Sequence, residues 1–406
     1  MVIRMSEKYL VINGGSSSLK FSLYEMPSEK IICKGYIEKI GSDDSFWNIS
    51  YNDDKISGAK FLKDHSTAVR IMIDELINNK IINSMDEISG VGHRVLHGGE
   101  IYSDSVMIND KVIKDIEDLT VLGPLHHPGE IAGIKAMQEV LKKVPQIAVF
   151  DTAFHQTMPR ENYIYAVPYE WYKKYSVRRY GFHGTSHKYI TELFQKKLGK
   201  RDVNLIICHV GSGASITCVK DGKSFDTSMG LTPLDGLVMG TRSGAIDPSI
   251  IKFVVDQSGM NLDEVTNALN KNSGLKGICG KNDFRDVVSL KSEGNDQANL
   301  AYDVFMDSII KHIAEYYFEL EGNVDAMVFT AGVLENNVVL REDIINKLSG
   351  PMGIKINKEI NNNIGYGKDN KEGIITTDDS KVMVYVIPTD EEIMIVRDTY
   401  RIIKEA

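Results

Sequence analysis

Two short runs of small residues have the composition of anion-binding loops. Residues 14–18 (GGSSS) stand between two apolar, alternating segments, and residues 211–215 (GSGAS) stand in a similar setting almost half the chain later. Such residues let several backbone N–H groups and serine hydroxyls approach an anion without obstruction by side chains. Lys20 adds a flexible positive charge just after the first run. The two runs predict a cradle for a polyphosphate, although neither matches the P-loop or the dinucleotide-binding glycine motif.

Four charged residues lie where a charge needs a partner. Arg94 and Arg242 are surrounded by glycines, in GVGHRVLHGGE and GLVMGTRSGAIDPS, which leave room at each guanidinium for the oxygens of a carboxylate or phosphate. Asp151 and Glu391 each follow an apolar segment that reads as a strand. A carboxylate in that position is costly unless it meets a metal ion or a positive charge. These residues predict a site that binds small anions.

The histidines allow a second interpretation. The neighbours His126 and His127, and the pair His183 and His187 at a spacing of four, could be metal ligands, because residues at that spacing share a helix face. Gly184 within the spacing instead indicates a loop that enters a helix, which argues against a zinc site. The four cysteines are scattered and form no Cys-x-x-Cys pair, so neither a cysteine zinc site nor a disulfide framework is expected.

The composition indicates a globular protein of two domains. The chain has 406 residues, more than one ordinary domain, and its 42% hydrophobic and 25% charged residues suffice for a sizeable core. A net charge of −9 argues against nucleic acid as a partner. No apolar run approaches the ~18 residues that span a bilayer, and Glu7 and Lys8 interrupt any signal peptide. We expect a soluble cytoplasmic protein that binds neither nucleic acid nor membrane.

The elements that would position these residues alternate between strands and helices. Each small-residue run lies between two apolar segments, which predicts a strand, a tight turn and a strand. Because this unit occurs once in each half of the chain, we infer two related lobes. Further units of a strand followed by a turn are predicted at 146–154, 325–336 and 381–392, and helices at 66–79, 130–143, 186–199, 297–320 and 391–404. The fold class is α/β with mixed sheets flanked by helices. The N-terminal lobe is residues 1–154, joined by the C-terminal helix 392–406, and the C-terminal lobe is residues 155–391.

Ten motifs between about residues 9 and 400 resemble those of the acetate kinase family, in the same order. They are VINGGSSSLKFSL, GHRVLHGGE, PLHHP, VFDTAFHQTMP, YGFHGTSH, CHVGSGASI, DTSMGLTPLDGLVMGTRSGAIDP, NDFRD, FTAGVLENN and IPTDEE. The resemblance implies the fold of the actin-like ATPases, of ribonuclease H type, with a nucleotide cleft between two related lobes. It also implies a homodimer.

The resemblance assigns roles to individual residues, here numbered in this sequence. The residues implied in catalysis are Arg94, His126, Asp151, His183 and Arg242. The pocket for the acyl group is implied to comprise Arg94, Leu96, Leu125, Phe182 and Pro233. The residues implied to bind the nucleotide are Ser16, Ser18, Lys20, His209, Val210, Gly211, Ser212, Gly213, Asp283, Phe284, Arg285, Gly332, Val333, Leu334, Glu335 and Asn336. Asn13 and Glu391 are implied to hold Mg²⁺, or Mn²⁺ in its place.

The implied reaction is the reversible transfer of the γ-phosphoryl group of ATP to acetate, with acetyl phosphate and ADP as products. A carboxylic acid of pKa about 4–5 is already an anion at neutral pH, so the attacking oxygen needs no general base. The harder task is to bring two anions together, which positive side chains and Mg²⁺ make feasible. We therefore expect Asp151 to orient other groups rather than to accept a proton.

Two alternatives stay open from the sequence. A propionate or short-chain acyl kinase would use the same residues with a wider pocket; Leu96, which is larger than the valine expected there, favours acetate. A non-catalytic nucleotide-binding homologue would keep the loops but not the charged residues. Ser212, Leu334 and Asp390 differ from the residues usual in the family, which leaves the choice of nucleotide open.

Overall fold

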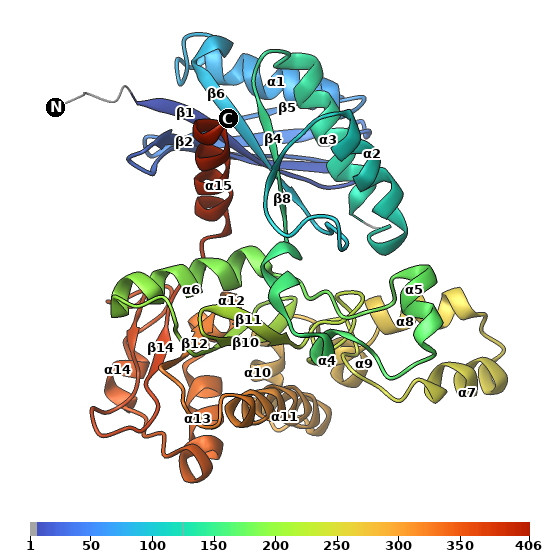
Figure 1. Ribbon diagram of the computed structural model, residues 1–406, viewed down its shortest axis with the longest axis vertical. Coiled ribbons are helices and arrows are strands. Elements are labelled where there is room, and N and C mark those ends of the chain that lie inside the picture. Colours follow the sequence, from blue (N-terminus) through green and yellow to red (C-terminus); the bar gives the residue numbers. More distant parts are fainter. Residues whose placement is uncertain (1–5, 125) are drawn as a thin grey trace. The chain divides into compact units, whose positions relative to one another are not determined.

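The computed structural model describes residues 6–124 and 126–406. The chain forms two compact units: the first runs to Phe154 and includes Asp390–Ala406, and the second is His155–Thr389. Each unit is built on one β-sheet with helices packed against it (Figure 1). Among the described residues, no helix is both long enough and apolar enough to cross a membrane.

The first unit contains a mixed eight-stranded sheet. Its strands are β1 (Glu7–Gly14), β2 (Ser18–Met26), β3 (Lys30–Glu38), β4 (Phe46–Tyr51), β5 (Asp54–Ala59), β6 (Ile88–Val95), β7 (Val106–Met107) and β8 (Gln146–Phe150). They lie in the order β5-β4-β3-β2-β1-β6-β8-β7. β1 to β5 form an antiparallel meander, whereas β1, β6 and β8 run parallel. The carboxyl ends of these three strands therefore meet at one edge of the sheet.

Helices cover both faces of this sheet. They are α1 (His65–Asn78), α2 (Asp110–Asp118), α3 (His127–Val140) and α15 (Glu391–Glu405), with 3₁₀ turns at Met85–Glu87, Leu119–Leu122 and Ala153–Thr157. Successive residues of a strand point to opposite faces. Val91 of β6 belongs to the core that includes Met137 of α3, whereas a Cβ atom at Gly92 would collide with Thr399 of α15. The glycine thus allows α15 to lie close against the sheet.

The second unit contains a mixed six-stranded sheet of related topology. Its strands are β9 (Leu205–Val210), β10 (Ala214–Lys220), β11 (Lys223–Thr227), β12 (Ala326–Thr330), β13 (Gly373–Ile374) and β14 (Val384–Val386), in the order β11-β10-β9-β12-β14-β13. β9, β10 and β11 are antiparallel, and β9, β12 and β14 are parallel. β1, β2, β3, β6 and β8 of the first unit are paired in the same way. The predicted pair of related lobes is confirmed.

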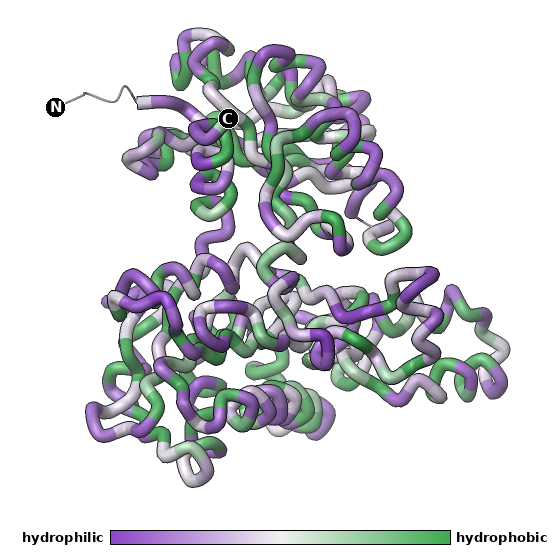
Figure 2. The backbone as a smooth tube through the Cα atoms, viewed as in Figure 1, coloured by the Kyte–Doolittle hydropathy of each residue, from purple (hydrophilic) through white to green (hydrophobic). Residues whose placement is uncertain are grey.

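Helices pack on both sides of the second sheet. They are α4 (Arg160–Tyr163), α5 (Tyr169–Tyr175), α6 (Gly184–Leu198), α7 (Ser249–Ser258), α8 (Leu262–Lys271), α9 (Gly274–Cys279), α10 (Phe284–Ser292), α11 (Asp296–Glu319), α12 (Gly332–Asn336), α13 (Val338–Met352) and α14 (Lys358–Asn362). α6 covers one side and α11 the other (Figure 1). Hydrophobic and hydrophilic residues alternate along α11 (Figure 2), and its buried residues recur at helical spacing from Ala298 to Tyr316.

The predicted elements agree well with the observed ones around the small-residue runs. Each run connects two antiparallel strands, β1 with β2 and β9 with β10, as predicted. The five predicted helices correspond to α1, α3, α6, α11 and α15, although α3 begins three residues earlier than predicted. Six short helices between Arg160 and Ser292, α4, α5 and α7 to α10, have no counterpart among the predicted elements.

Candidate active site

The first unit holds an ion pair at the carboxyl edge of its parallel strands. Arg94 lies near the end of β6, and Asp151 directly follows β8, the neighbouring parallel strand. Nε and Nη2 of Arg94 donate to Oδ2 of Asp151 over 3.0 and 2.5 Å. Asp151 is 1% exposed, and its charge raises the pKa of the Arg94 guanidinium. Within the described part of the chain Nη1 of Arg94 makes no hydrogen bond, so one arm of the fork is left for a ligand.

Two further carboxyl groups act on the same guanidinium. Glu130 of α3 is 6% exposed and accepts hydrogen bonds from the backbone N–H of Leu96, and burial raises its pKa to about 8. Burial also raises the pKa of Glu391, the first residue of α15; the charge of Arg94 opposes this rise and that of Asp151 adds to it. A bound cation would favour the charged forms of carboxyl groups that lie close to one another.

Asn13 and Glu391 are the residues of this edge that could hold a divalent cation. Asn13 is half-buried near the end of β1 and follows Ile12, which is paired with β6 one residue before Arg94. α15, which begins with Glu391, packs against β1, β6 and β8. Amide and carboxylate oxygens are donors that Mg²⁺ prefers, and a cation would stabilise the charged form of Glu391. His126 directly precedes α3 and is also half-buried.

The first small-residue loop lies against the start of α3. The backbone N–H of Gly15 donates to the oxygen of Ser18 over 2.8 Å and closes the turn. A Cβ atom at Gly129 of α3 would lie 2.6 Å from the backbone nitrogen of Ser16, so only glycine allows this approach. The side chains of Ser16 and Lys20 are exposed, and that of Ser18 is half-buried. These groups are available to the oxygens of a phosphate.

The residues predicted for the acyl pocket are divided between the two units. Leu96 of the first unit is buried, and a Cβ atom at Gly123 would lie 3.3 Å from its Cδ2. Leu125 lies outside the described residues. Phe182 and Pro233 belong to the second unit, in which Phe182 is fully buried and Pro233 is half-buried.

The second unit places Arg242 beside the second small-residue loop. A Cβ atom at Gly213 would lie 3.5 Å from the ring of His183 and 3.6 Å from Nη1 of Arg242, so both side chains border this glycine. Nη1 of Arg242 makes only long contacts, to the oxygen of Pro233 at 3.4 Å and to Sδ of Met239 at 3.7 Å. No carboxylate of the described residues pairs with it, and burial lowers its pKa. This guanidinium is therefore suited to an anionic ligand.

A serine links the histidines around His183. Nδ1 of His183 and Nε2 of His187 are hydrogen-bonded to Oγ of Ser215 over 2.9 and 2.8 Å, and the rings of His183 and His209 stack 4.2 Å apart. His183 has a φ of 55°, a conformation that is uncommon outside glycine and is concentrated at functional sites. Among the described residues, these histidines form no group that could hold a metal ion, so the zinc interpretation gains no support.

A cavity of about 540 Å³ opens in the second unit next to the second small-residue loop. Residues named from the sequence line it: Gly211, Ser212, Asp283, Phe284, Arg285, Gly332, Val333 and Asn336. Residues that the sequence analysis did not name also line it: Gly240, Leu275, Asn282, Phe305, Asn337 and Tyr366. The size and the mixture of apolar and polar walls suit the adenosine part of a nucleotide.

Two planar groups are exposed at this cavity. The Arg285 side chain is 88% exposed and is held by Asp283, whose Oδ2 accepts from Nη2 over 2.6 Å. Asp283 also caps α10 by accepting from the backbone N–H of Arg285. Tyr366 is 92% exposed. A guanidinium and an aromatic ring are groups on which a nucleobase stacks.

Five other residues of the second unit that were predicted to bind the nucleotide lie outside the lining of this cavity. They are His209, Val210, Gly213, Leu334 and Glu335. Leu334 is fully buried and its backbone oxygen accepts from Arg341. The Glu335 carboxylate accepts from the backbone N–H groups of Ala331 and Thr389 over 2.6 and 3.1 Å. Both residues thus shape the turn after β12 that presents Gly332 and Val333 to the cavity.

Comparison with known proteins identifies the family to which this chain is similar. The model of the Acetokinase family matches residues 8–397. The acetate kinase of Bacillus cytotoxicus is 50% identical over 398 residues, which cover 97% of this chain and 98% of that protein, and the acetate kinase of Bacillus subtilis is 50% identical over 98% and 100%. Among solved structures, acetate kinase from Porphyromonas gingivalis has a TM-score of 0.91 at 40% identity, covering 98% and 99% of the chains. A propionate kinase from Francisella tularensis has a TM-score of 0.90 at 42% identity, covering 97% and 99%.

Proposed function

This chain belongs to the acetokinase family, and we propose that it is a kinase that transfers the γ-phosphoryl group of ATP reversibly to acetate, giving acetyl phosphate and ADP. The structural observation that carries the proposal is the pairing of Arg94 with Asp151, which fixes a guanidinium and leaves its Nη1 available. Such a group is suited to a small carboxylate. The same guanidinium would bind acetate in the forward reaction and the acetyl group of acetyl phosphate in the reverse reaction.

We assign the roles of the charged side chains from the charge that must be stabilised. Acetate is an anion at neutral pH, so Arg94 binds and orients it, and Asp151 keeps Arg94 in place rather than accepting a proton. During in-line transfer, negative charge spreads over the equatorial oxygens of the phosphoryl group. Arg242 has no carboxylate partner in the described residues, and with His183 it is suited to stabilise that charge.

Separate groups of residues are proposed for the nucleotide and for the metal ion. The adenosine part of ATP binds in the cavity beside Phe284, with Arg285 and Tyr366 available for stacking. Asn13 and Glu391 hold Mg²⁺, or Mn²⁺ in its place, and the metal ion supplies neutralisation of the phosphate charge. Ser16, Ser18 and Lys20 contact phosphate oxygens.

An assay with purified protein tests the activity directly. With ATP, Mg²⁺ and acetate, hydroxylamine should trap an acyl phosphate, and its amount should equal the ADP formed. Binding of ATP with no acyl phosphate would instead favour the non-catalytic homologue. The Asp303→Asn variant, which changes an exposed carboxylate on α11, is a matched control and should retain full activity.

Acetate is the acid that we propose as the preferred substrate. Leu96 is bulky and buried, and such a wall narrows the space beside Arg94. A relative of comparable similarity is described as a propionate kinase, so propionate is the competitor to measure. One methylene group in an apolar pocket is worth about 1–3 kcal/mol, and kcat/KM should therefore be highest for acetate and lower for propionate and butyrate. A higher value for propionate would reverse this assignment.

We also propose a cytoplasmic homodimer. The four cysteines are free, which suits a reducing compartment. α5, α7 and α8 of the second unit expose large apolar side chains: Tyr169, Trp171, Tyr175, Ile250, Phe253 and Leu262. Exposed aromatic and aliphatic side chains are typical of subunit interfaces. Sedimentation analysis should give twice the mass of the chain, and Phe253→Glu should shift it towards the monomer.

A further inference from the structure

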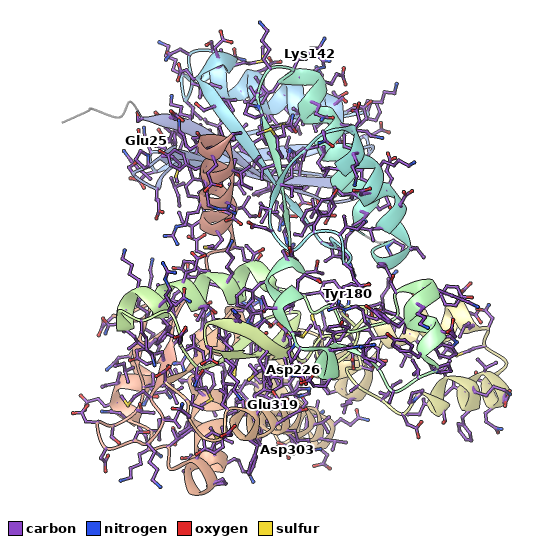
Figure 3. The ribbon with its side chains drawn as sticks, in the orientation of Figure 1. Glu25, Lys142, Tyr180, Asp226, Asp303 and Glu319 are labelled. Carbon is purple, nitrogen blue, oxygen red and sulfur yellow. The ribbon has the colours of Figure 1, made fainter. Side chains whose placement is uncertain are left out.

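A second cluster of acidic side chains lies near the end of α11, away from the nucleotide cavity. Asp226 of β11 and Glu315 and Glu319 of α11 each offer a carboxylate oxygen, and these three atoms lie within 4.8 Å of one another. Figure 3 shows Asp226 and Glu319 close together in the second unit. Phe305 lines the nucleotide cavity from the same helix, and at 1.5 Å per residue the cluster begins about 15 Å further along the helix axis. The two sites are distinct.

A buried hydroxyl group indicates that the cluster binds something. Tyr316 lies between the two glutamates in the sequence and is 1% exposed, and its Oη has no hydrogen-bond partner among the described residues. Its largest electrostatic interactions are with Asp226, Arg179, Glu315 and Glu319, in that order, so the hydroxyl faces the cluster. Oε2 of Glu319 is likewise buried without a hydrogen-bond partner. Nε of Arg179, next to Asp226, is also buried without a hydrogen-bond partner. Buried polar atoms are almost always paired, and the two unpaired oxygen atoms of Tyr316 and Glu319 point to a ligand at this place.

The surrounding charges leave the cluster negative. Nη1 of Arg179 reaches Oδ1 of Asp226 at 3.4 Å, while Asp235 adds a further negative charge near Asp226. Lys220 donates to the backbone oxygen of Glu319, over 3.3 Å, rather than to its carboxylate. One guanidinium thus faces four carboxyl groups. Glu315 and Glu319 also lie in the last turns of α11, where the helix dipole favours positive charge.

We propose that Asp226, Glu315 and Glu319 bind a divalent cation of the oxygen-preferring class, Ca²⁺ or Mn²⁺, which ties the end of α11 to the edge strand β11. Three oxygens within 4.8 Å of one another fit around an ion at metal–oxygen distances of about 2.3–2.6 Å. Tyr316 Oη completes the site as a further oxygen donor or as a partner of a bound water. The site needs neither nucleotide nor acetate and is independent of the proposed function.

The test is a titration of chelator-treated, nucleotide-free protein with Mn²⁺ at pH 7.5, with free Mn²⁺ measured by electron paramagnetic resonance. The wild type should bind one Mn²⁺ more than Glu319→Gln does, and Ca²⁺ should displace this ion. Asp303→Asn, on the same helix (Figure 3), should bind as the wild type does. Glu391→Gln should also keep this ion, which separates it from a metal ion bound with the nucleotide.

Thermal unfolding gives an independent test, because the effect of Glu319→Gln on the unfolding temperature should differ between chelator and added metal ion. In chelator, Glu319→Gln should unfold at the same or a higher temperature than the wild type, because it removes one of several repelling charges. With Mn²⁺ or Ca²⁺, the unfolding temperature should rise by several degrees for the wild type and Asp303→Asn but not for Glu319→Gln. If Glu319→Gln does not fold, Asp226→Asn tests the same site. Equal Mn²⁺ stoichiometry and equal thermal shifts in wild type and variant, or no binding by the wild type at millimolar Mn²⁺ and Ca²⁺, would overturn the proposal.

Discussion

Arg94 in the first unit and Arg242 in the second have similar settings in the sequence but different settings in the structure. Both lie in glycine-rich segments. Arg94 is held by Asp151, with Glu130 and Glu391 nearby, and these carboxyl groups raise its pKa. Arg242 meets a backbone oxygen and a methionine sulfur, and burial lowers its pKa.

The difference separates two uses of a guanidinium. A guanidinium that is paired with a buried carboxylate has a fixed orientation, and its remaining arm can bind a substrate with little loss of entropy. A half-buried guanidinium without a carboxylate gains its counter-charge only when an anion arrives, so it stabilises whichever state carries the most negative charge. Arg94 is therefore expected to govern binding of the acid, and Arg242 the rate of transfer.

Substitution of Arg242 should give the largest effect on the rate. Arg242→Ala removes a donor aimed at developing charge, so kcat should fall by about 10²–10³, with a small change in KM for acetate. Steady-state kinetics of acyl phosphate formation measure both constants. Arg242→Lys keeps the charge but not the fork and should recover only part of the loss. A change confined to KM would show that Arg242 binds the ground state.

Removing the partner of Arg94 should mainly weaken binding of the acid. In Asp151→Asn the guanidinium loses its charged anchor, so KM for acetate should rise roughly tenfold or more, through lost orientation. The pair is largely buried, so the free energy of unfolding should also fall, by about 3 kcal/mol. Arg94→Ala should raise KM for acetate in the same way. An unchanged KM in both variants would remove the pair from the binding site.

The wall beside Arg94 should control which acid is used. Leu96→Val removes one methylene group from a buried side chain, so kcat/KM for propionate relative to acetate should rise about tenfold. Parallel assays with the two acids measure the ratio. Leu275→Val, at the nucleotide cavity, is a matched control that should leave the ratio unchanged.

Glu130 should make the stability of the first unit depend on pH. Its folded-state pKa of about 8 lies above its value of about 4.3 when unfolded. The folded state therefore holds the extra proton between these values, and stability falls as pH rises towards 8. Glu130→Gln removes this loss, so relative to wild type its free energy of unfolding should gain about 3 kcal/mol between pH 5.5 and 8.5. Urea unfolding at both pH values measures the difference, and parallel curves would contradict it.

Local patterns were sufficient for the elements that carry the two small-residue loops. Alternating apolar residues and a run of glycine and serine specify a hairpin through short-range geometry. The six short helices in residues 160–292 are only 4 to 10 residues long, so each repeats its apolar pattern over few turns, and they were not predicted. One of them, α8, begins with a capping box made by Asn261 and Glu264, a local motif that could have revealed it.

Sequence motifs account for only part of the lining of the nucleotide cavity. Asn282 is the first residue of the NDFRD motif and Asn337 is the last residue of FTAGVLENN, so both could have been named from these motifs. Phe305 and Tyr366 line the same cavity from distant parts of the sequence. Their places depend on how α11 and the loop after α14 pack, and no local pattern encodes such packing.

Side-chain type and chain order therefore established the α/β class, the two hairpins and a set of charged residues suited to phosphoryl transfer, because these follow from short-range periodicity and chemical character. The folded chain alone established that Asp151 pairs with Arg94, that Arg242 has no such carboxylate among the described residues, and that Asp226 meets Glu315 and Glu319. These pairings join segments far apart in sequence. Strand register and helix packing determine which side chains meet. They therefore also determine the net charge of each site.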